Sequence, residues 1–135
     1  MSKTILLVDD EQATVRLLEM NLVRAGYDVL KAYDGIQALE IVRQTPPDLM
    51  FLDVTMPRMD GKEVLTTMKS DPALKDIPVI MFTANREQED LDEALREGAE
   101  YFVAKPVNPV ELMGMIKRFF EDRGQFDDWE QLPGT

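Results

Sequence analysis

Short segments typical of strands, most of them apolar, alternate along this chain with longer segments whose apolar residues recur at helical spacing. The predicted strands occupy residues 4–8, 27–32, 49–52, 78–82 and 101–104, of which only 27–32 contains charged residues, and the amphipathic segments occupy residues 12–25, 36–44, 61–68, 87–97 and 108–122. Strands that are apolar throughout are buried on both faces, and strands that alternate with helices form parallel sheets. The pattern therefore predicts one α/β domain with helices on both faces of a five-stranded parallel sheet.

Polar side chains follow four of the predicted strands. Asp9 and Asp10 follow the first, Asp53 the third, Thr83 the fourth and Lys105 the fifth. The functional site of such a fold lies at the carboxyl ends of the strands, so we expect these side chains to meet at one edge. Three carboxylates in one shallow site repel one another unless a cation joins them, and Mg²⁺ commonly binds one or two carboxylates plus water.

The composition narrows the chemistry of that site. The chain has no cysteine and no histidine, which excludes disulfides, thiolate metal sites, a cysteine nucleophile and a histidine base. Any metal must be held by oxygen, which favours Mg²⁺, Ca²⁺ or Mn²⁺. The net charge of −11 argues against direct nucleic-acid binding. No signal peptide or membrane span is evident, so we expect a cytoplasmic protein without membrane insertion.

Four sequence pieces at strand ends carry a resemblance to a known family. They are VDDE (8–11), LDVTMPRMDG (52–61), FTA (82–84) and FVAKPV (102–107). In this order they resemble the receiver domain of two-component response regulators, of the single-domain type found in chemotaxis, over residues 3–122. The resemblance implies a flavodoxin-like (βα)₅ three-layer sandwich with strand order 2-1-3-4-5.

The resemblance also implies a role for each acidic residue. Asp53 matches the phosphoacceptor, which takes a phosphoryl group from a histidine kinase or a histidine phosphotransfer protein. Asp10 matches the direct Mg²⁺ ligand, together with Asp53 and the backbone carbonyl of Thr55. Asp9 matches the carboxylate that holds metal-bound water. Mn²⁺ is the alternative ion.

Three further residues match the family's response to phosphorylation. Thr83 matches the hydroxyl that bonds the phosphoryl oxygen, and Lys105 matches the lysine that pairs with Asp53 and then with the phosphoryl group. Phe102 matches an aromatic switch residue, although an aromatic residue in a strand is often simply part of the core. Because the chain has no histidine, the phosphoryl donor must be external.

The resemblance predicts a stand-alone signalling module rather than a turnover enzyme. Its output would be protein contact through the surface of segments 87–97, 101–104 and 108–122, with homodimerisation on phosphorylation as a further option. One alternative is a receiver-like scaffold that is not phosphorylated. Another is a haloacid-dehalogenase-type phosphatase that forms an aspartyl phosphate. That class requires a second aspartate two residues after the nucleophile, where this chain has Thr55.

The end of the chain lies outside the resemblance. Asn108 and Pro109 give a helix start signal, and the helix that they open closes a receiver domain of residues 1–122. Residues 123–135 form an acidic tail in which Phe126, Trp129 and Leu132 are spaced by three. We expect a disordered tail or the stump of a linker to an output domain, with a docking segment as the alternative.

Overall fold

The computed structural model describes residues 2–54, 56, 59–83, 96, 98–104 and 108–121. The chain divides into two compact units, Met1–Lys105 and Pro106–Thr135. The first unit contains the whole sheet and helices α1 (Gln12–Arg24), α2 (Gly35–Gln44) and α3 (Gly61–Lys69). The second contains helix α5 (Pro109–Glu121).

The sheet has five parallel strands in the order β2-β1-β3-β4-β5, which confirms the predicted topology. Their bounds are β1 (Thr4–Val8), β2 (Asp28–Ala32), β3 (Leu49–Asp53), β4 (Val79–Thr83) and β5 (Tyr101–Ala104). The chain runs outward from β1 to β2 and then returns to the other side of β1 with β3. The order therefore reverses at the β1/β3 pair, where open α/β sheets form their binding crevice.

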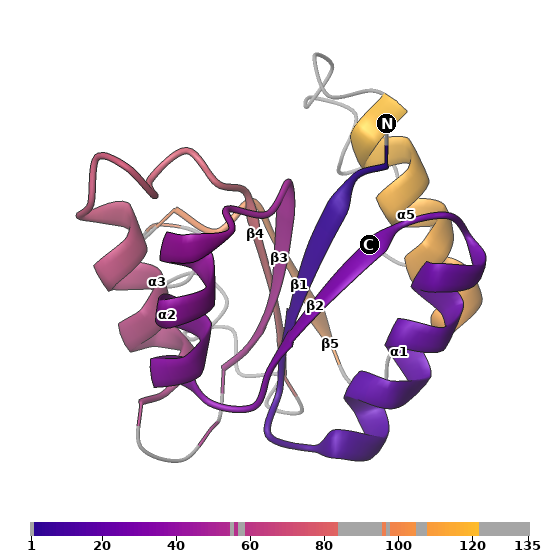
Figure 1. Ribbon diagram of the computed structural model, residues 1–135, viewed down its shortest axis with the longest axis horizontal. Coiled ribbons are helices and arrows are strands. Elements are labelled where there is room, and N and C mark those ends of the chain that lie inside the picture. The colour runs from indigo at the N-terminus through magenta and orange to yellow at the C-terminus, as the bar shows by residue number, and fades with distance from the viewer. Residues whose placement is uncertain are drawn as a thin grey trace. The chain divides into compact units, whose positions relative to one another are not determined.

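Helices cover both faces of this sheet in the first unit. Helices α2 and α3 lie side by side on one face, and α1 lies on the opposite face (Figure 1). Helix α2 begins after Asp34, whose side chain accepts a hydrogen bond from the Gln37 backbone N–H at 2.8 Å. Helix α3 begins in the same way after Asp60, which accepts from the Glu63 N–H at 3.0 Å. Both are N-caps, and such a cap contributes about 1 kcal/mol to helix stability.

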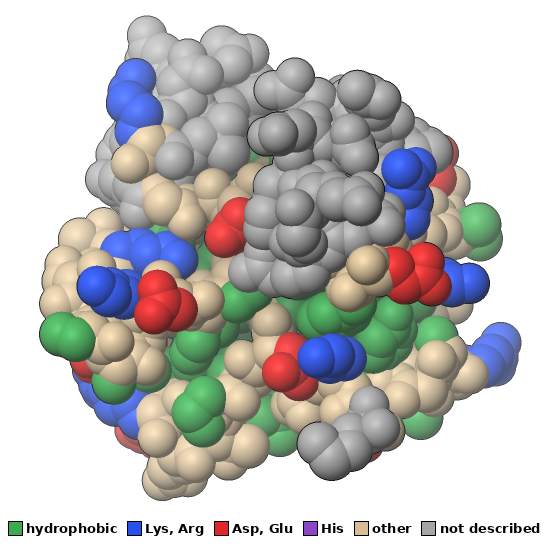
Figure 2. Space-filling model, turned by 90° about the horizontal axis from the view of Figure 1, so that it is seen from above, with side chains coloured by type: hydrophobic (Ala, Val, Ile, Leu, Met, Phe, Trp, Pro, Cys, Tyr) green, Lys and Arg blue, Asp and Glu red, His purple; other side chains and the backbone are tan. Residues whose placement is uncertain are grey.

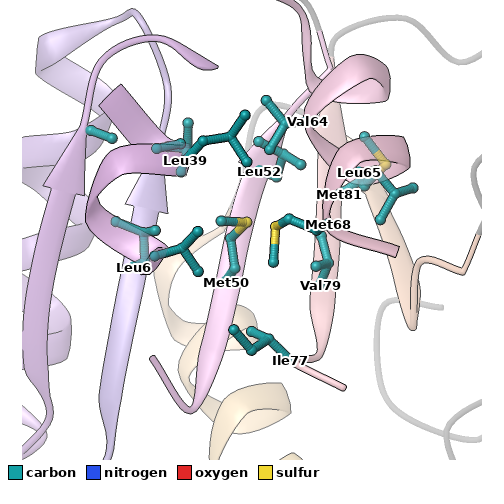
Figure 3. Packing of buried hydrophobic residues seen from close by; sticks show 14 of the residues in the cluster. Leu6, Leu39, Met50, Leu52, Val64, Leu65, Met68, Ile77, Val79 and Met81 are labelled. Carbon is teal, nitrogen blue, oxygen red and sulfur yellow. The ribbon is translucent and has the colours of Figure 1, made fainter. Parts of the chain in front are cut away.

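The core between the sheet and the α2–α3 layer is built from alternate strand residues. Leu6, Met50, Leu52, Val79 and Met81 point toward this layer, as Figure 3 shows, and all five are fully buried. The helices contribute Leu39, Val64, Leu65 and Met68 to the same cluster. Burying one such side chain stabilises the fold by about 1.5–3 kcal/mol.

The opposite face of the sheet carries the intervening strand residues. Phe51 of β3 and Phe82 of β4 are buried there and make an edge-to-face contact with ring centroids 6.3 Å apart. Helix α1 buries Val15, Leu18 and Leu22, which share one helical face. This face of the helix is the one that the apolar spacing of the sequence predicted.

Helix α5 shows the same amphipathic pattern within the second unit. The Oδ1 atom of Asn108 accepts hydrogen bonds from the N–H groups of Val110 at 2.9 Å and Glu111 at 3.3 Å, which confirms the predicted N-cap. The helix buries Leu112, Met115, Ile116 and Phe119, which lie on one face of the helix.

Two strands extend one residue further than the sequence pattern indicated. Asp53 is the last residue of β3 and Thr83 the last residue of β4, whereas both were expected to follow their strands. The helix expected over residues 87–97 lies outside the described residues except for Arg96, which is helical. Residues 122–135 also lie outside them. In the part of the chain that the structure describes, no helix is both long and apolar enough to cross a membrane.

A lysine joins the end of α3 to the turns that lead into β4 and β5. The Lys69 Nζ atom donates to the backbone carbonyls of Lys75 at 2.9 Å and Ile77 at 3.3 Å. A Cβ atom added at Gly98 would lie 3.1–3.2 Å from three Lys69 side-chain carbons, so the aliphatic part of Lys69 packs against this turn.

On the face drawn in Figure 2, basic and acidic side chains lie interspersed rather than separated.

Replacing Lys69 by methionine should destabilise the fold, because the carbonyls of Lys75 and Ile77 would lose their donor. Because these carbonyls are exposed or only partly buried, losing each hydrogen bond should cost about 0.5–1.5 kcal/mol in the free energy of unfolding, measurable by urea denaturation. The exposed Lys75 provides a matched control, since Lys75→Met removes the same charge and should change stability by less than about 0.5 kcal/mol. Equal effects of the two substitutions would contradict a structural role for the Lys69 ammonium group.

The same lysine should give the stability a pH dependence. Burial lowers the pKa of Lys69 from its ordinary value of 10.5, although the nearby Glu100 and Asp76 carboxylates act in the opposite direction. The unfolded chain therefore holds this proton more tightly than the folded chain does. As the pH rises from neutral toward 10.5, the stability of the wild type should increase relative to Lys69→Met. Paired urea denaturations across this range measure the difference, and a constant difference would argue against the burial effect.

Candidate functional site

Three carboxylates meet at the carboxyl ends of β1 and β3. One oxygen from each of Asp9, Asp10 and Asp53 lies within 4.8 Å of the other two. Asp9 is 1% exposed and Asp53 is 3% exposed, whereas Asp10 is exposed to solvent. Because β1 and β3 are neighbouring parallel strands, their ends bring together residues that are more than forty positions apart in the sequence. The predicted convergence of these three residues is therefore observed.

The backbone around Asp9 is fixed by hydrogen bonds to two elements. Its N–H donates to the carbonyl of Ala32 at 3.2 Å, which continues the pairing of β1 with β2 by one residue. Its Oδ1 atom accepts from the N–H of Glu11 at 3.0 Å. The carboxylate is thus held between the end of β1 and the start of α1.

The backbone around Asp53 is fixed by the neighbouring strand and by α3. Asp53 lies opposite Phe82 of β4, and the next residue, Val54, donates its N–H to the Phe82 carbonyl at 3.1 Å. The Val54 carbonyl in turn accepts from the N–H of Gly61 at 2.9 Å. The chain therefore returns to the end of β3 after leaving it, and α3 begins beside Asp53.

The electrostatics of the cluster favour a bound cation. Two unit charges at the limiting separation of 4.8 Å repel by roughly 3 kcal/mol at an effective dielectric constant of 20. Oxygen-only donors, two of them buried and one open to water, suit a hard divalent ion that retains part of its hydration shell. The residues present therefore fit Mg²⁺, and Mn²⁺ accepts the same kind of donors.

The other predicted site residues are described only in part. The backbone of Thr83 ends β4 at this same edge of the sheet, one residue beyond Phe82. Thr55 and Lys105 lie outside the described residues. Phe102 of β5 lies opposite Met81 and is partly buried against the core cluster. Its role as a switch stays a prediction.

Sequence reasoning assigned no function to Gly61, which the structure places against the phosphoacceptor candidate. A Cβ atom at this position would lie 2.2 Å from the backbone oxygen of Asp53. The only sequence signal for this contact is the Asp60-Gly61 pair before an amphipathic segment. That signal predicts a helix start but does not indicate which backbone the helix start approaches.

Comparison with protein families and curated proteins gives consistent results. A family model described as the response regulator receiver domain matches residues 5–117. The alkaline phosphatase synthesis transcriptional regulatory protein PhoP of Bacillus subtilis is 41% identical over 117 residues, which cover 87% of this chain and 48% of that protein. The response regulator PleD of Caulobacter vibrioides is 39% identical over 131 residues, or 97% of this chain and 29% of that protein. The chain thus spans less than half of either relative.

Solved structures show the same fold. A putative response regulator from Chloroflexus aurantiacus aligns with a TM-score of 0.83 and 31% identity, covering 90% of this chain and 99% of that one. The chemotaxis protein CheY4 of Vibrio cholerae aligns with a TM-score of 0.82 and 30% identity, covering 87% and 98% of the two chains. These structures are matched over nearly their whole length, unlike the two curated relatives.

The crowding of the three carboxylates predicts a stability that depends on divalent ions. Without such ions, Asp10→Asn should stabilise the protein by about 1 kcal/mol, because one of three like charges is removed. With excess Mg²⁺ the wild type should become more stable than Asp10→Asn, since the wild type gains binding free energy that the variant has partly lost. Urea denaturation with and without Mg²⁺ measures both effects.

A carboxylate outside the cluster provides the control. Asp28 is exposed at the start of β2, and Asp28→Asn removes the same charge from this acidic chain. Its effect should be smaller and independent of Mg²⁺. If Asp28→Asn and Asp10→Asn behaved alike under both conditions, the three carboxylates would not form a functional cluster.

Proposed function

Because this chain belongs to the family of response regulator receiver domains, we propose that it accepts a phosphoryl group on Asp53 and signals through protein contacts. The observation that supports Asp53 is its position. It is an almost fully buried carboxylate at the end of a central strand, within 4.8 Å of two further carboxylates. Phosphoryl transfer depends mainly on positioning and on charge neutralisation. The fixed position of Asp53 provides the positioning, and a cation bound to the three carboxylates would provide the charge neutralisation.

Asp9, Asp10 and Asp53 are the residues that would hold Mg²⁺, with the carbonyl of Thr55 as a further ligand implied by the family. When bound, the ion neutralises charge on the carboxylates and on the phosphoryl oxygens. The hydrogen bond from the Glu11 N–H to Asp9 Oδ1 keeps that carboxylate oriented while the exposed Asp10 faces water. The family resemblance implies that Asp9 would hold metal-bound water and that Asp10 would bind the ion directly.

The reaction is an in-line displacement at phosphorus. A carboxylate oxygen of Asp53 attacks the phosphorus atom of a phosphohistidine on the donor protein. The P–N bond breaks, and the imidazole of the donor leaves with the electron pair and takes a proton from solvent. The product is an aspartyl phosphate. This chain has no histidine of its own, so the donor is external. The family resemblance implies a histidine kinase or a histidine phosphotransfer protein, and a small phosphate anhydride can serve the same purpose.

The switch follows from contacts that only the phosphorylated protein can make. The hydroxyl of Thr83 and the ammonium of Lys105 would bind the phosphoryl oxygens and draw the ends of β4 and β5 toward Asp53. Phe102 is already partly buried against the core, so a change in its burial would carry this movement to the surface. The output surface predicted from the sequence includes residues outside those described, and it stays a prediction together with homodimerisation.

Incubation with Mg²⁺ and acetyl phosphate, followed by intact-mass measurement, tests the proposal. The wild type should gain one phosphoryl group only when Mg²⁺ is present, and Asp53→Asn should gain none. Asp28→Asn, which alters an exposed carboxylate away from the site, should be phosphorylated like the wild type. An adduct that persists in Asp53→Asn would place the acceptor elsewhere.

Two further outcomes separate this function from its alternatives. Absence of both an adduct and beryllofluoride binding would favour a scaffold that is not phosphorylated. Hydrolysis of many equivalents of a phosphoester per protein molecule would favour a phosphatase, since a receiver is consumed by its own phosphorylation until the aspartyl phosphate hydrolyses.

A further inference from the structure

Helices α2 and α3 begin with the same two residues and with the same local geometry. Each opens with an Asp-Gly pair in which the aspartate is the N-cap and the glycine is the first helical residue. Gly35 and Gly61 are both buried, and neither has the positive φ that Gly26 and Gly98 show. Their lack of a side chain is therefore not needed for an unusual backbone conformation.

Both glycines are needed for space, but they face different neighbours. A Cβ atom at Gly61 would lie 2.2 Å from the backbone oxygen of Asp53 and 2.9 Å from the Cα atom of Val54. A Cβ atom at Gly35 would lie 2.6 Å from the carbonyl oxygen of Met59 and 2.8 Å from Cγ2 of Val64. Only the Gly61 contact involves a member of the carboxylate cluster.

The end of β3 has little freedom to move away from Gly61. Val54 is hydrogen-bonded through its N–H to β4 and through its carbonyl to Gly61 itself. A side chain at position 61 must therefore either displace the Asp53–Val54 backbone or push the start of α3 outward. Either movement strains or breaks the bond between the Gly61 N–H and the Val54 carbonyl.

We propose that Gly61 is a positioning residue for the carboxylate cluster, because the close approach of its Cα atom fixes the backbone of Asp53 relative to Asp9 and Asp10. The inference rests on the proposed function in that the cluster is taken to bind a divalent ion. A Cβ atom at position 61 shifts Asp53 and spoils the joint geometry of the three carboxylates. Metal affinity is sensitive to such displacements, because residues that orient the ligands typically contribute about 10–100-fold.

The pair of Asp-Gly helix starts provides a matched test. Gly61→Ala and Gly35→Ala introduce the same methyl group at the same helical position against a backbone carbonyl, and both should lower stability. Gly114→Ala in α5 introduces it where no atom outside the local helix lies within 4 Å. Gly61→Ala thus reports crowding at the carboxylate cluster, Gly35→Ala reports crowding away from it, and Gly114→Ala reports the effect of the substitution without crowding.

Isothermal titration of each folded protein with Mg²⁺ gives the decisive readout, with urea denaturation defining the folded fraction. Gly61→Ala should bind Mg²⁺ about tenfold more weakly than the wild type, whereas Gly35→Ala and Gly114→Ala should stay within about twofold. Wild-type affinity in Gly61→Ala, or an equal loss in Gly35→Ala, would overturn the inference. If the wild type itself bound no Mg²⁺, the metal site of the proposed function would fail first, and the inference with it.

A measurement on the wild type covers the case in which Gly61→Ala does not fold. Coupling between two sites is reciprocal, so an ion that engages Asp53 must also stabilise the contact that positions Asp53. Mg²⁺ should therefore slow hydrogen exchange of the Gly61 N–H more than that of the Gln37 N–H, which is hydrogen-bonded to the N-cap of α2. Equal protection of the two amides by Mg²⁺ would contradict a positioning role.

Discussion

The mutual repulsion of Asp9, Asp10 and Asp53 is the main physical constraint on the carboxyl edge of the sheet. Asp9 and Asp53 are almost fully buried, and burial of like charges side by side opposes folding. The arrangement is retained in the folded chain because the strands that carry these residues are fixed by a parallel ladder and a fully buried apolar core. The stability of the sheet thus offsets an unfavourable charge arrangement at its edge, where a bound cation would relieve the repulsion.

The backbone rather than the side chains supplies the precision of this edge. Asp9 and Asp53 each lie at a point where a strand ends and the backbone of the following or a neighbouring element contacts the residue. For Asp9 the closing group is the N–H of Glu11, and for Asp53 it is the start of α3 at Gly61. Both contacts come from the first residues after a strand or of a helix, so the βα connections themselves shape the cluster.

Sequence reasoning located the site because its residues lie at strand ends. Apolar runs that stop at Asp9 and Asp53 place both residues at the carboxyl edge once the sheet is parallel, and the observed strand order makes their strands neighbours. The predicted end of β3 was one residue too early, since Asp53 continues the ladder as a polar residue opposite Phe82. Apolar patterning cannot show that a charged residue still pairs with its neighbour, because the pairing is made by the backbone.

The apolar pattern of the sequence could not predict contacts between segments that are distant in the sequence. Lys69 is a lysine in the last turn of an amphipathic helix, a position that normally indicates a solvated side chain. Its partial burial arises only when the turns before β4 and β5 fold around it. Gly35 and Gly61 look identical in the sequence, and only the packing of α2 and α3 distinguishes a glycine that faces Met59 from one that faces Asp53.

The two edges of the sheet therefore differ in how their charges are satisfied. At the amino edge, one ammonium group binds two backbone carbonyls and lies near Glu100 and Asp76, although burial still lowers the pKa of Lys69. At the carboxyl edge, three carboxylates are gathered within 4.8 Å of one another, in an arrangement that fits a divalent cation. A ligand that bound unequally to two states of the carboxyl edge would shift the equilibrium between them, which is what the proposed switch requires.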